Sequence, residues 1–255
     1  MTVTEQKFWV VIPAAGIGKR MNADRPKQYL TLLDKTVLEH TLSIFTDHER
    51  ISGVIVALAE HDEYWPSLNV KSSKPLLTVI GGKDRCDSVL NALNGLKELA
   101  EDKDWALVHD AARPCLCKED LDRLLISMSL HRVGGLLAAP VADTLKKVSQ
   151  GCTVEKTVDR EHVWRALTPQ MFHVGKLRKS LIAAKEKKLL VTDESSAMEF
   201  AGYEPLVIEG HPGNIKITQT EDLALAEFYL ANKQRCQKIK DQKNEANKET
   251  NNQCA

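Results

Sequence analysis

The sequence has no excess of charge of either sign and no apolar stretch long enough to cross a membrane. Lysine plus arginine and aspartate plus glutamate number 35 each among 255 residues. Without net charge the chain has no overall field that attracts nucleic acid or an acidic membrane, so any anion site must be local. The first residues lack the basic and apolar segments of a signal peptide. These features predict a cytoplasmic protein with neither nucleic acid nor membrane as a partner.

Cysteine is present, but without the spacing of a metal centre. The six cysteines are at positions 86, 115, 117, 152, 236 and 254. Cys115 and Cys117 have neither a second cysteine pair nor a histidine at ligand spacing, so we interpret them as loop thiols and assign no metal ligand. A chain of this length with 43% hydrophobic residues can bury a substantial core without disulfides.

Two common phosphate-binding motifs are also missing. No Walker loop with Gly-Lys-Ser/Thr exists, and Met21 stands where a dinucleotide fingerprint needs its third glycine. Residues 10–29 instead read VVIPAAGIGKRMNADRPKQY, an apolar strand followed by a turn of small residues and then by cations. The small residues are Ala14, Ala15, Gly16 and Gly18, and the cations are Lys19, Arg20, Arg25 and Lys27.

This segment predicts a site for a polyphosphate. Small side chains let backbone N–H groups approach phosphate oxygens, and the cations that follow can neutralise several negative charges. The alternative is a strand-to-loop turn with incidental surface cations, because glycine-rich turns after strands are common. The density of cations after the turn favours a nucleotide enzyme.

Apolar runs alternate with amphipathic stretches along the rest of the chain, which predicts a mostly parallel sheet with helices on both faces. The predicted strands are 8–13, 54–58, 76–80, 106–109, 135–139 and 205–208, and the predicted helices are 36–47, 84–100, 118–131, 174–187 and 220–230. We expect one α/β domain over residues 1–231. Residues 232–255 have little apolar content and are interpreted as a disordered tail, with an interaction helix as the alternative.

Two unusual motifs follow predicted strands. GGKDRCDS at 81–88 comes after the third strand, and HDAARP at 109–114 comes after the fourth. Open sheets of this kind bind ligands at the carboxyl ends of their strands. The glycines of the first motif allow close backbone approach, and Asp110 and Arg113 of the second are placed to meet a ribose, a metal or a phosphate.

Residues 140–172 depart from the alternation. Two short β-like runs flank a polar turn at 149–151, which predicts a β-hairpin arm over about residues 140–163. Such an arm has too little apolar surface to be stable alone, so a second copy of the chain is the expected partner. Thr144, Arg160 and Thr168 at its ends suit phosphate binding, and each is as readily explained as a solvated strand residue.

Taken together and in order, the segment 10–29, GGKDRCDS, HDAARP, APVADTLK, TVDR with WRALTPQMF, TDESSAMEF and NIKIT resemble the 2-C-methyl-D-erythritol 4-phosphate cytidylyltransferases of the non-mevalonate isoprenoid pathway. The resemblance runs from about residue 8 to residue 230. It implies a Rossmann-like domain, a homodimer built by the arm, and transfer of CMP from CTP to methylerythritol phosphate with release of pyrophosphate. It also implies Mg²⁺ held mainly through the CTP phosphates, without a firm protein ligand.

The resemblance implies a role for each matching residue. The implied catalytic residues are Arg20, Lys27 and Lys216. The implied nucleotide-binding residues are Ala14, Ala15, Gly16, Gly18, Gly82, Lys83, Ser88, Asp110, Ala111 and Arg113. The implied residues for the polyol phosphate are Thr144, Arg160, Thr168, Thr192 and Asp193, with Arg160 supplied by the neighbouring subunit. Two positions depart from the family pattern, namely Lys83, where an acid is frequent, and Gly213, which is expected to leave the polyol pocket more open.

No histidine is expected to act as a base, because the attacking phosphate oxygen is already anionic. His109, His173 and His211 are therefore interpreted as structural. Two other functions stay open, a cytidylyltransferase for another polyol phosphate such as ribitol 5-phosphate and a nucleotide-binding regulatory dimer without chemistry. The substitution Lys27→Ala separates an enzyme from a binder, because a binder loses only affinity.

Overall fold

The computed structural model describes residues 6–16 and 24–232. Its strands are β1 (Phe8–Pro13), β2 (Thr31–Leu32), β3 (Lys35–Thr36), β4 (Gly53–Leu58), β5 (Leu76–Ile80), β6 (Trp105–Val108), β7 (Gly134–Pro140), β8 (Leu145–Val148), β9 (Val154–Val158), β10 (Trp164–His173) and β11 (Leu206–Glu209). Its helices are α1 (Val37–Thr46), α2 (Arg85–Gly95), α3 (Lys118–Ser129), α4 (Val174–Glu186) and α5 (Glu194–Phe200), with short 3₁₀ helices η2 (Lys27–Tyr29) and η3 (Trp65–Ser67). Residues 221–232 are also helical.

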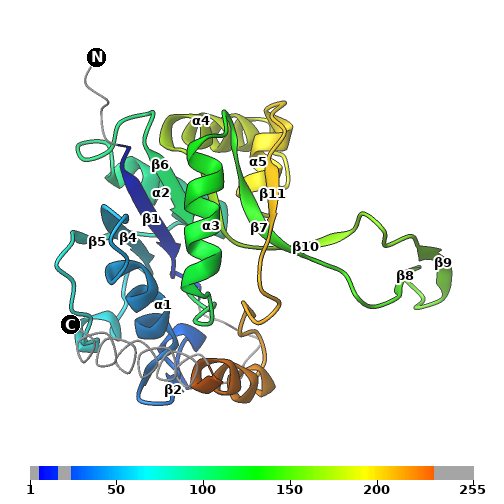
Figure 1. Ribbon diagram of the computed structural model, residues 1–255, viewed down its shortest axis with the longest axis horizontal. Coiled ribbons are helices and arrows are strands. Elements are labelled where there is room, and N and C mark those ends of the chain that lie inside the picture. The colour runs from blue at the N-terminus through cyan, green and yellow to red at the C-terminus, as the bar shows by residue number, and fades with distance from the viewer. Residues whose placement is uncertain (1–5, 17–23, 233–255) are drawn as a thin grey trace, which may run out of the picture.

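A seven-stranded sheet in the order β11-β7-β10-β6-β1-β4-β5 forms the centre of the protein (Figure 1). β10 runs antiparallel to its neighbours β6 and β7, and the other neighbouring strands are parallel. The prediction of a mostly parallel α/β sheet is confirmed. Since β1, β4, β5 and β6 are parallel, the loops that follow them emerge at one edge of the sheet.

The central strand β1 is apolar on both faces because helices cover both faces of the sheet. Val10 and Ile12 pack with Leu38 and other residues of α1 and α3 in one core cluster. Trp9 and Val11 pack on the other side with residues of α2, α4 and α5. A strand buried on both faces reads as a continuous apolar run, which is why the sequence predicts β1 at its true bounds.

Side-chain caps set where the helices begin. Thr36 and Glu39 form a reciprocal capping box at the start of α1, in which each side chain accepts the backbone N–H of the other residue. Asp84 accepts the backbone N–H of Asp87 at 2.9 Å and so starts α2 at Arg85. Asp193 caps α5 in the same way. The caps of α2 and α5 bring the first residues of these helices to the site described below.

The sequence prediction lacks the short strands β2 and β3, the two 3₁₀ helices, and two elements that shape the site region, β10 and α5. β10 occupies a central place in the sheet although the sequence predicts only a hairpin there, and α5 is a helix of 7 residues. β10 contains Pro169 and a register shift between Ala166 and Gln170, so its pattern is broken in the middle. Helix α2 ends at Gly95, before the predicted end at residue 100.

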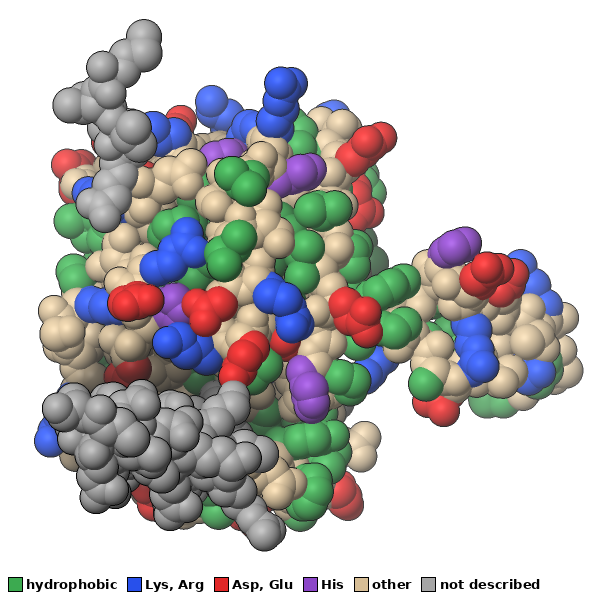
Figure 2. All heavy atoms as spheres, viewed as in Figure 1, with side chains coloured by type: hydrophobic (Ala, Val, Ile, Leu, Met, Phe, Trp, Pro, Cys, Tyr) green, Lys and Arg blue, Asp and Glu red, His purple; other side chains and the backbone are tan. Residues whose placement is uncertain are grey.

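Residues 141–163 form an excursion between β7 and β10. Within it β8 and β9 pair antiparallel, with Leu145 opposite Val158, and the pair projects from the body of the protein (Figure 1). Most of its side chains are exposed, including Val148 and Val154. Figure 2 shows acidic and basic side chains mixed over one face of the body, without a continuous region of one sign. None of the helices in the described part of the chain is long and apolar enough to span a bilayer.

Candidate active site

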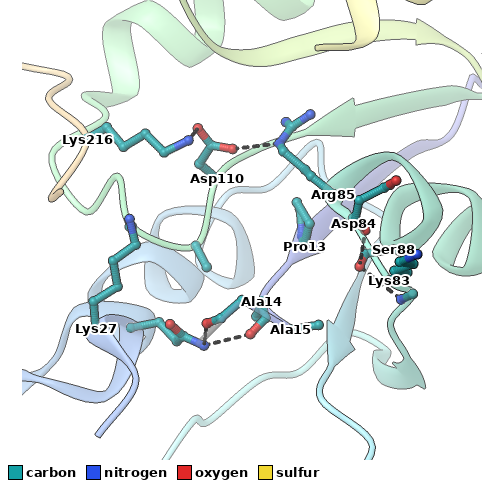
Figure 3. Close-up of a pocket in the computed structure, with 15 residues that line it drawn as sticks. Pro13, Ala14, Ala15, Lys27, Lys83, Asp84, Arg85, Ser88, Asp110 and Lys216 are labelled. Carbon is teal, nitrogen blue, oxygen red and sulfur yellow. Dashed lines mark hydrogen bonds and ion pairs between the residues drawn. The ribbon is translucent and has the colours of Figure 1, made fainter. Parts of the chain in front are cut away.

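A cavity of about 220 Å³ lies where β1, β5 and β6 end (Figure 3). Its wall consists of residues 13–16 at the end of β1, residues 82–85 with Ser88 after β5, residues 110–112 after β6, and Lys27, Gln28 and Lys216. These segments meet because parallel strands bring their carboxyl ends to one edge of the sheet. The predicted residues that line the cavity are Ala14, Ala15, Gly16, Lys27, Gly82, Lys83, Ser88, Asp110, Ala111 and Lys216. Gly18 and Arg20 lie outside the described residues.

Gln28 holds the loop after β1 and was missed by sequence reasoning. Its side-chain amide donates to the carbonyl oxygen of Ala14 at 2.6 Å and to that of Gly16 at 3.1 Å. The backbone N–H of Ala14 donates to the carbonyl oxygen of Ala57 at the end of β4, at 2.8 Å. Because Gln28 is buried, these bonds fix the loop shape. The one signal for Gln28 in the sequence was its place beside Lys27.

The glycines of GGKDRCDS are required by close packing at the cavity wall. A Cβ at Gly81 would lie 2.5 Å from the Cβ of Ala15, and one at Gly82 would lie 2.2 Å from the Cβ of Asp87. The backbone N–H of Gly82 donates to the hydroxyl of Ser88 at 3.0 Å. The loop after β5 therefore packs directly against the loop after β1, and both present backbone to the cavity.

Lys27 and Lys216 approach the cavity from segments 189 positions apart, and Figure 3 draws both on the same side of it. The ammonium group of Lys27 donates to the carbonyl oxygen of Ile217 at 2.8 Å. The segment that carries Lys216 is in turn held by the backbone N–H of Ile217, which donates to the carbonyl oxygen of Ala112 at 2.9 Å. The fold thus places two of the three predicted catalytic cations at one cavity.

Asp110 is the centre of a cationic cluster. One carboxylate oxygen lies 3.1 Å from Nε of Arg85, and the other lies 2.9 Å from Nζ of Lys216 and 3.3 Å from Nε of Arg113. Burial opposes ionisation of Asp110, but the charges of Arg85, Lys216 and Arg113 outweigh it and hold the pKa of this carboxyl well below its usual range. Asp110 is therefore a carboxylate with both oxygens engaged by cations.

Arg85 and Glu194 complete the cluster, and sequence reasoning assigned a role to neither. The two terminal nitrogens of Arg85 donate to the two carboxylate oxygens of Glu194 at 2.7 Å and 3.0 Å. Arg85 is the first residue of α2 and Glu194 the first of α5, so the pair joins two helices beside the cavity. The sequence held no signal for this pair, because its partners lie 109 positions apart.

His109 lies behind Asp110 in a directional chain of hydrogen bonds. Its Nε2 faces the carbonyl oxygen of Arg113 at 3.0 Å, so this nitrogen carries the proton. Its Nδ1 therefore accepts from the hydroxyl of Thr168 at 3.0 Å, and that hydroxyl accepts from the backbone N–H of Asp110 at 3.2 Å. Burial lowers the pKa of His109 to about 4. The imidazole is neutral and orders the loop after β6.

The comparisons with known proteins agree with this geometry. The profile of the family described as IspD, 2-C-methyl-D-erythritol 4-phosphate cytidylyltransferase, matches residues 8–232. A protein of that name from Pseudomonas entomophila is 53% identical over 224 residues, which cover 88% of this chain and 95% of the relative. One from Pseudomonas aeruginosa is 52% identical and covers 85% of this chain and 93% of the relative. The chain belongs to this family.

Solved structures of the cytidylyltransferase family share the fold. A crystal structure titled 4-diphosphocytidyl-2C-methyl-D-erythritol synthase matches with a TM-score of 0.77 and 38% identity, covering 88% of this chain and 99% of that one. The Francisella tularensis 2-C-methyl-D-erythritol 4-phosphate cytidylyltransferase matches with a TM-score of 0.77 and 37% identity, covering 88% of this chain and all of the other. As a member of the family, the chain is a nucleotidyltransferase.

The residues assigned to the polyol pocket do not line the cavity of this cytidylyltransferase. Thr168 is buried in the hydrogen-bond chain to His109, and its carbonyl oxygen accepts from the side chain of Asn214 at 2.7 Å. One carboxylate oxygen of Asp193 caps α5, and the other accepts from the amide of Gln170 at 2.8 Å. Thr192 is exposed beside this cap. Their contact with the polyol stays a prediction.

Thr144 and Arg160 flank the β8–β9 hairpin rather than the cavity. Both are exposed, and the guanidinium of Arg160 donates to the carbonyl oxygen of Ala142. Arg113 does not line the cavity either. It lies behind Asp110, where its guanidinium donates to the carbonyl oxygen of Asn214 at 2.7 Å. This position suits the implied role of Arg113 in ordering the site.

Gly213 does not line the nucleotide cavity. It lines a second cavity, formed with the start of α3 and the helix at 221–232, and a Cβ there would lie 2.9 Å from the ring of Tyr229. The absence of a side chain at 213 therefore makes room for Tyr229, and its effect on the polyol pocket stays a prediction. In the described residues no three His, Cys, Asp or Glu side chains are grouped as metal ligands.

Proposed function

We propose that the cavity between β1, β5 and β6 binds CTP and that the protein transfers CMP to 2-C-methyl-D-erythritol 4-phosphate. A phosphate oxygen of the acceptor attacks the α-phosphorus of CTP, the bond from that phosphorus to the bridging oxygen breaks, and pyrophosphate leaves. Two anions must meet in this step, and charge flows onto the leaving group. Clustered cations are the main requirement of such a site.

The observation that carries the proposal is the convergence of Lys27, Lys216 and the cluster around Asp110 on one cavity beneath a loop of small residues. Lys27 and Lys216 are positioned to bind phosphate oxygens as negative charge develops on them. The backbone of residues 14–16 and 82–83 offers fixed donors and acceptors to the base and the phosphates. Arg20 joins this set by resemblance.

Mg²⁺ is proposed to enter as part of the substrate, bound to the triphosphate. Asp110 is the carboxylate closest to the centre of the cationic cluster, and its oxygens are engaged by Arg85, Arg113 and Lys216. It is therefore not arranged as a metal ligand. A triphosphate oxygen set suits Mg²⁺, which prefers oxygen ligands and retains water.

The acceptor is proposed to bind between the cavity of one subunit and the arm of another. In this arrangement Thr144 and Arg160 of the arm bind the acceptor phosphate, and Thr168, Thr192 and Asp193 line the polyol site. The exposed hairpin supports the proposal, because an isolated two-stranded hairpin gains stability when it packs on a partner. Cys86, Cys117 and Cys152 form no disulfide, which supports a cytoplasmic location for the enzyme.

Pyrophosphate release tests the function. Purified protein with CTP and Mg²⁺ is given methylerythritol 4-phosphate, ribitol 5-phosphate or no acceptor, and release is expected with methylerythritol 4-phosphate alone. Lys27→Ala should lower kcat by roughly 10²-fold or more, because it removes a cation that stabilises the transition state. Lys71→Ala is the matched control, since Lys71 is exposed and does not line the cavity.

Each other outcome contradicts a separate part of the proposal. Release with ribitol 5-phosphate would support the assignment of the CTP site but would show that the acceptor assignment is wrong. Binding of CTP without release under any condition would favour the regulatory alternative. A Lys27→Ala variant that loses CTP affinity but keeps kcat would remove Lys27 from the chemistry.

A further inference from the structure

Arg85 joins two carboxylates that come from distant parts of the chain. It forms a bidentate ion pair with Glu194, with hydrogen bonds of 2.7 Å and 3.0 Å, and its Nε lies 3.1 Å from Asp110. The carboxylate of Glu194 is only 1% exposed and that of Asp110 only 9%, whereas the side chain of Arg85 is 28% exposed and lines the cavity. Arg85 therefore links the cavity to a fully buried acid. Figure 3 shows its contact with Asp110 at the cavity.

The charges of the cluster nearly balance. Arg85, Arg113 and Lys216 supply three positive charges, Asp110 and Glu194 supply two negative charges, and the difference is +1. One positive charge thus remains to face an anionic nucleotide. Without Arg85 the cluster is neutral, and Glu194 becomes a buried carboxylate without its arginine. A buried charge that loses its partner is costly, and it also repels a nearby triphosphate.

Arg85 also limits how strongly Asp110 holds Lys216. Asp110 divides its charge between Arg85 on one oxygen and Arg113 with Lys216 on the other. Removing Arg85 leaves the whole carboxylate charge to Arg113 and Lys216. Lys216 is then held more tightly in its resting contact and is less available to a phosphate oxygen.

We propose that Arg85 is a positioning residue for cytidylyl transfer, which neutralises Glu194 and leaves Lys216 free to move from Asp110 to the nucleotide. The proposal rests on the proposed function, because it assigns Lys216 to the CTP phosphates. Arg85 acts through charge balance and through Lys216 rather than through its own contact with the substrate. This role makes a distinctive prediction, namely that a second, charge-balancing substitution repairs the loss of Arg85.

The experiment compares Arg85→Gln, Glu194→Gln and the double variant Arg85→Gln/Glu194→Gln. Arg85→Gln is expected to weaken CTP binding and lower kcat/KM by roughly 100-fold, because it leaves a buried charge unpaired. The double variant restores the difference of +1, and its kcat/KM is expected to recover to within roughly tenfold of the wild type. The remaining loss reflects the tighter hold of Asp110 on Lys216, which the second substitution does not relieve. Glu194→Gln alone removes an anion, raises the difference to +2 and is expected to bind CTP at least as tightly as the wild type. Arg85→Lys keeps the charge but cannot form the bidentate ion pair, so its kcat/KM should lie between those of Arg85→Gln and the wild type.

Arg123→Gln provides the matched control. Arg123 also pairs with a buried acid, Asp120, at 2.5 Å, but it does not line the nucleotide cavity. It should lose stability in thermal unfolding without a change in CTP affinity. If Arg85 is merely structural, Arg85→Gln behaves in the same way, with normal kcat/KM for each folded molecule, and the proposal is overturned.

CTP affinity measured by titration calorimetry, with Mg²⁺ and without acceptor, separates this inference from the proposed function. A double variant that binds CTP as weakly as Arg85→Gln would show that neutralising Glu194 is not the role of Arg85, and would also overturn the proposal. A wild-type protein that releases no pyrophosphate with any acceptor contradicts the proposed function, but the order of CTP affinities among the variants still tests Arg85. Recovery in the double variant is the supporting result.

Discussion

At the scale of single residues, the buried imidazole of His109 gives the protein a defined pH dependence. Burial lowers the pKa of His109 in the folded state to about 4 from an ordinary value of 6.5. The unfolded chain therefore binds this proton between pH 6.5 and pH 4 while the folded chain does not. The free energy of unfolding must fall as the pH falls through this window, by about 2 kcal/mol between pH 7.5 and pH 5 from this residue.

Urea unfolding at pH 7.5 and pH 5 checks the prediction against a His109→Gln variant. The carboxylates titrate in both proteins, so their contributions cancel when the two pH-dependent losses are subtracted. On acidification, the free energy of unfolding of the wild type is expected to fall by about 2 kcal/mol more than that of the variant. Equal losses would show that His109 does not stay neutral in the fold.

Some residues of the site could be predicted from the sequence, and others could not. Lys27, Asp110 and Lys216 could be predicted to share a site because each stands in a motif after a strand or in a resembling segment, and they line one cavity. Arg85 and Gln28 could not, because their roles depend on partners that only the folded chain brings near. The contact of Gly213 with Tyr229 could not be predicted for a similar reason, since it depends on the packing of the helix at 221–232.

At the scale of elements, the contact between β7 and β11 depends on a glycine. A Cβ at Gly135 would lie 1.9 Å from the backbone carbonyl oxygen of Leu206, its register partner in the neighbouring strand. Backbone in a paired strand cannot move aside as the end of a side chain can. Gly135→Ala should therefore lower the free energy of unfolding by roughly 2 kcal/mol or more.

Gly151→Ala in the turn between β8 and β9 is the control for this prediction. The nearest atom to a Cβ at Gly151 is the hydroxyl oxygen of Ser149 at 3.8 Å, an ordinary contact. This variant should change stability by no more than about 0.5 kcal/mol in the same urea titration. A Gly135→Ala protein as stable as the control would mean that β11 can separate from β7 without cost.

The elements also show where pattern reading fails. The buried parallel strands β1 and β4 were predicted within one residue because a strand covered on both faces is a short apolar run. β10 begins with three exposed residues and includes Pro169 and a register shift, so it has no such run. Only its pairing with β6 and β7 makes it a central strand.

At the scale of the whole molecule, the position of the β8–β9 arm raises the question of whether one subunit suffices for activity. The β8–β9 hairpin projects from the body, and Thr144 and Arg160 beside it do not line the cavity of their own chain (Figure 1). If Arg160 binds the acceptor phosphate in the neighbouring subunit, a complete site needs Lys27 from one chain and Arg160 from another. Neither Lys27→Ala nor Arg160→Ala should then be active alone.

Mixed dimers of these two inactive variants give a decisive test. In a mixed dimer one site lacks both residues, but the other combines Lys27 of the Arg160→Ala chain with Arg160 of the Lys27→Ala chain. Random exchange makes half of the dimers mixed, and each has one of two sites intact, so about a quarter of the wild-type activity should return. The two variants are coexpressed with different affinity tags, and pyrophosphate release is measured before and after selection for both tags. Selection should raise the recovered activity to about half of the wild type, because every remaining dimer has one intact site. If Arg160 instead serves the cavity of its own chain, neither site of a mixed dimer has both residues, and no activity returns.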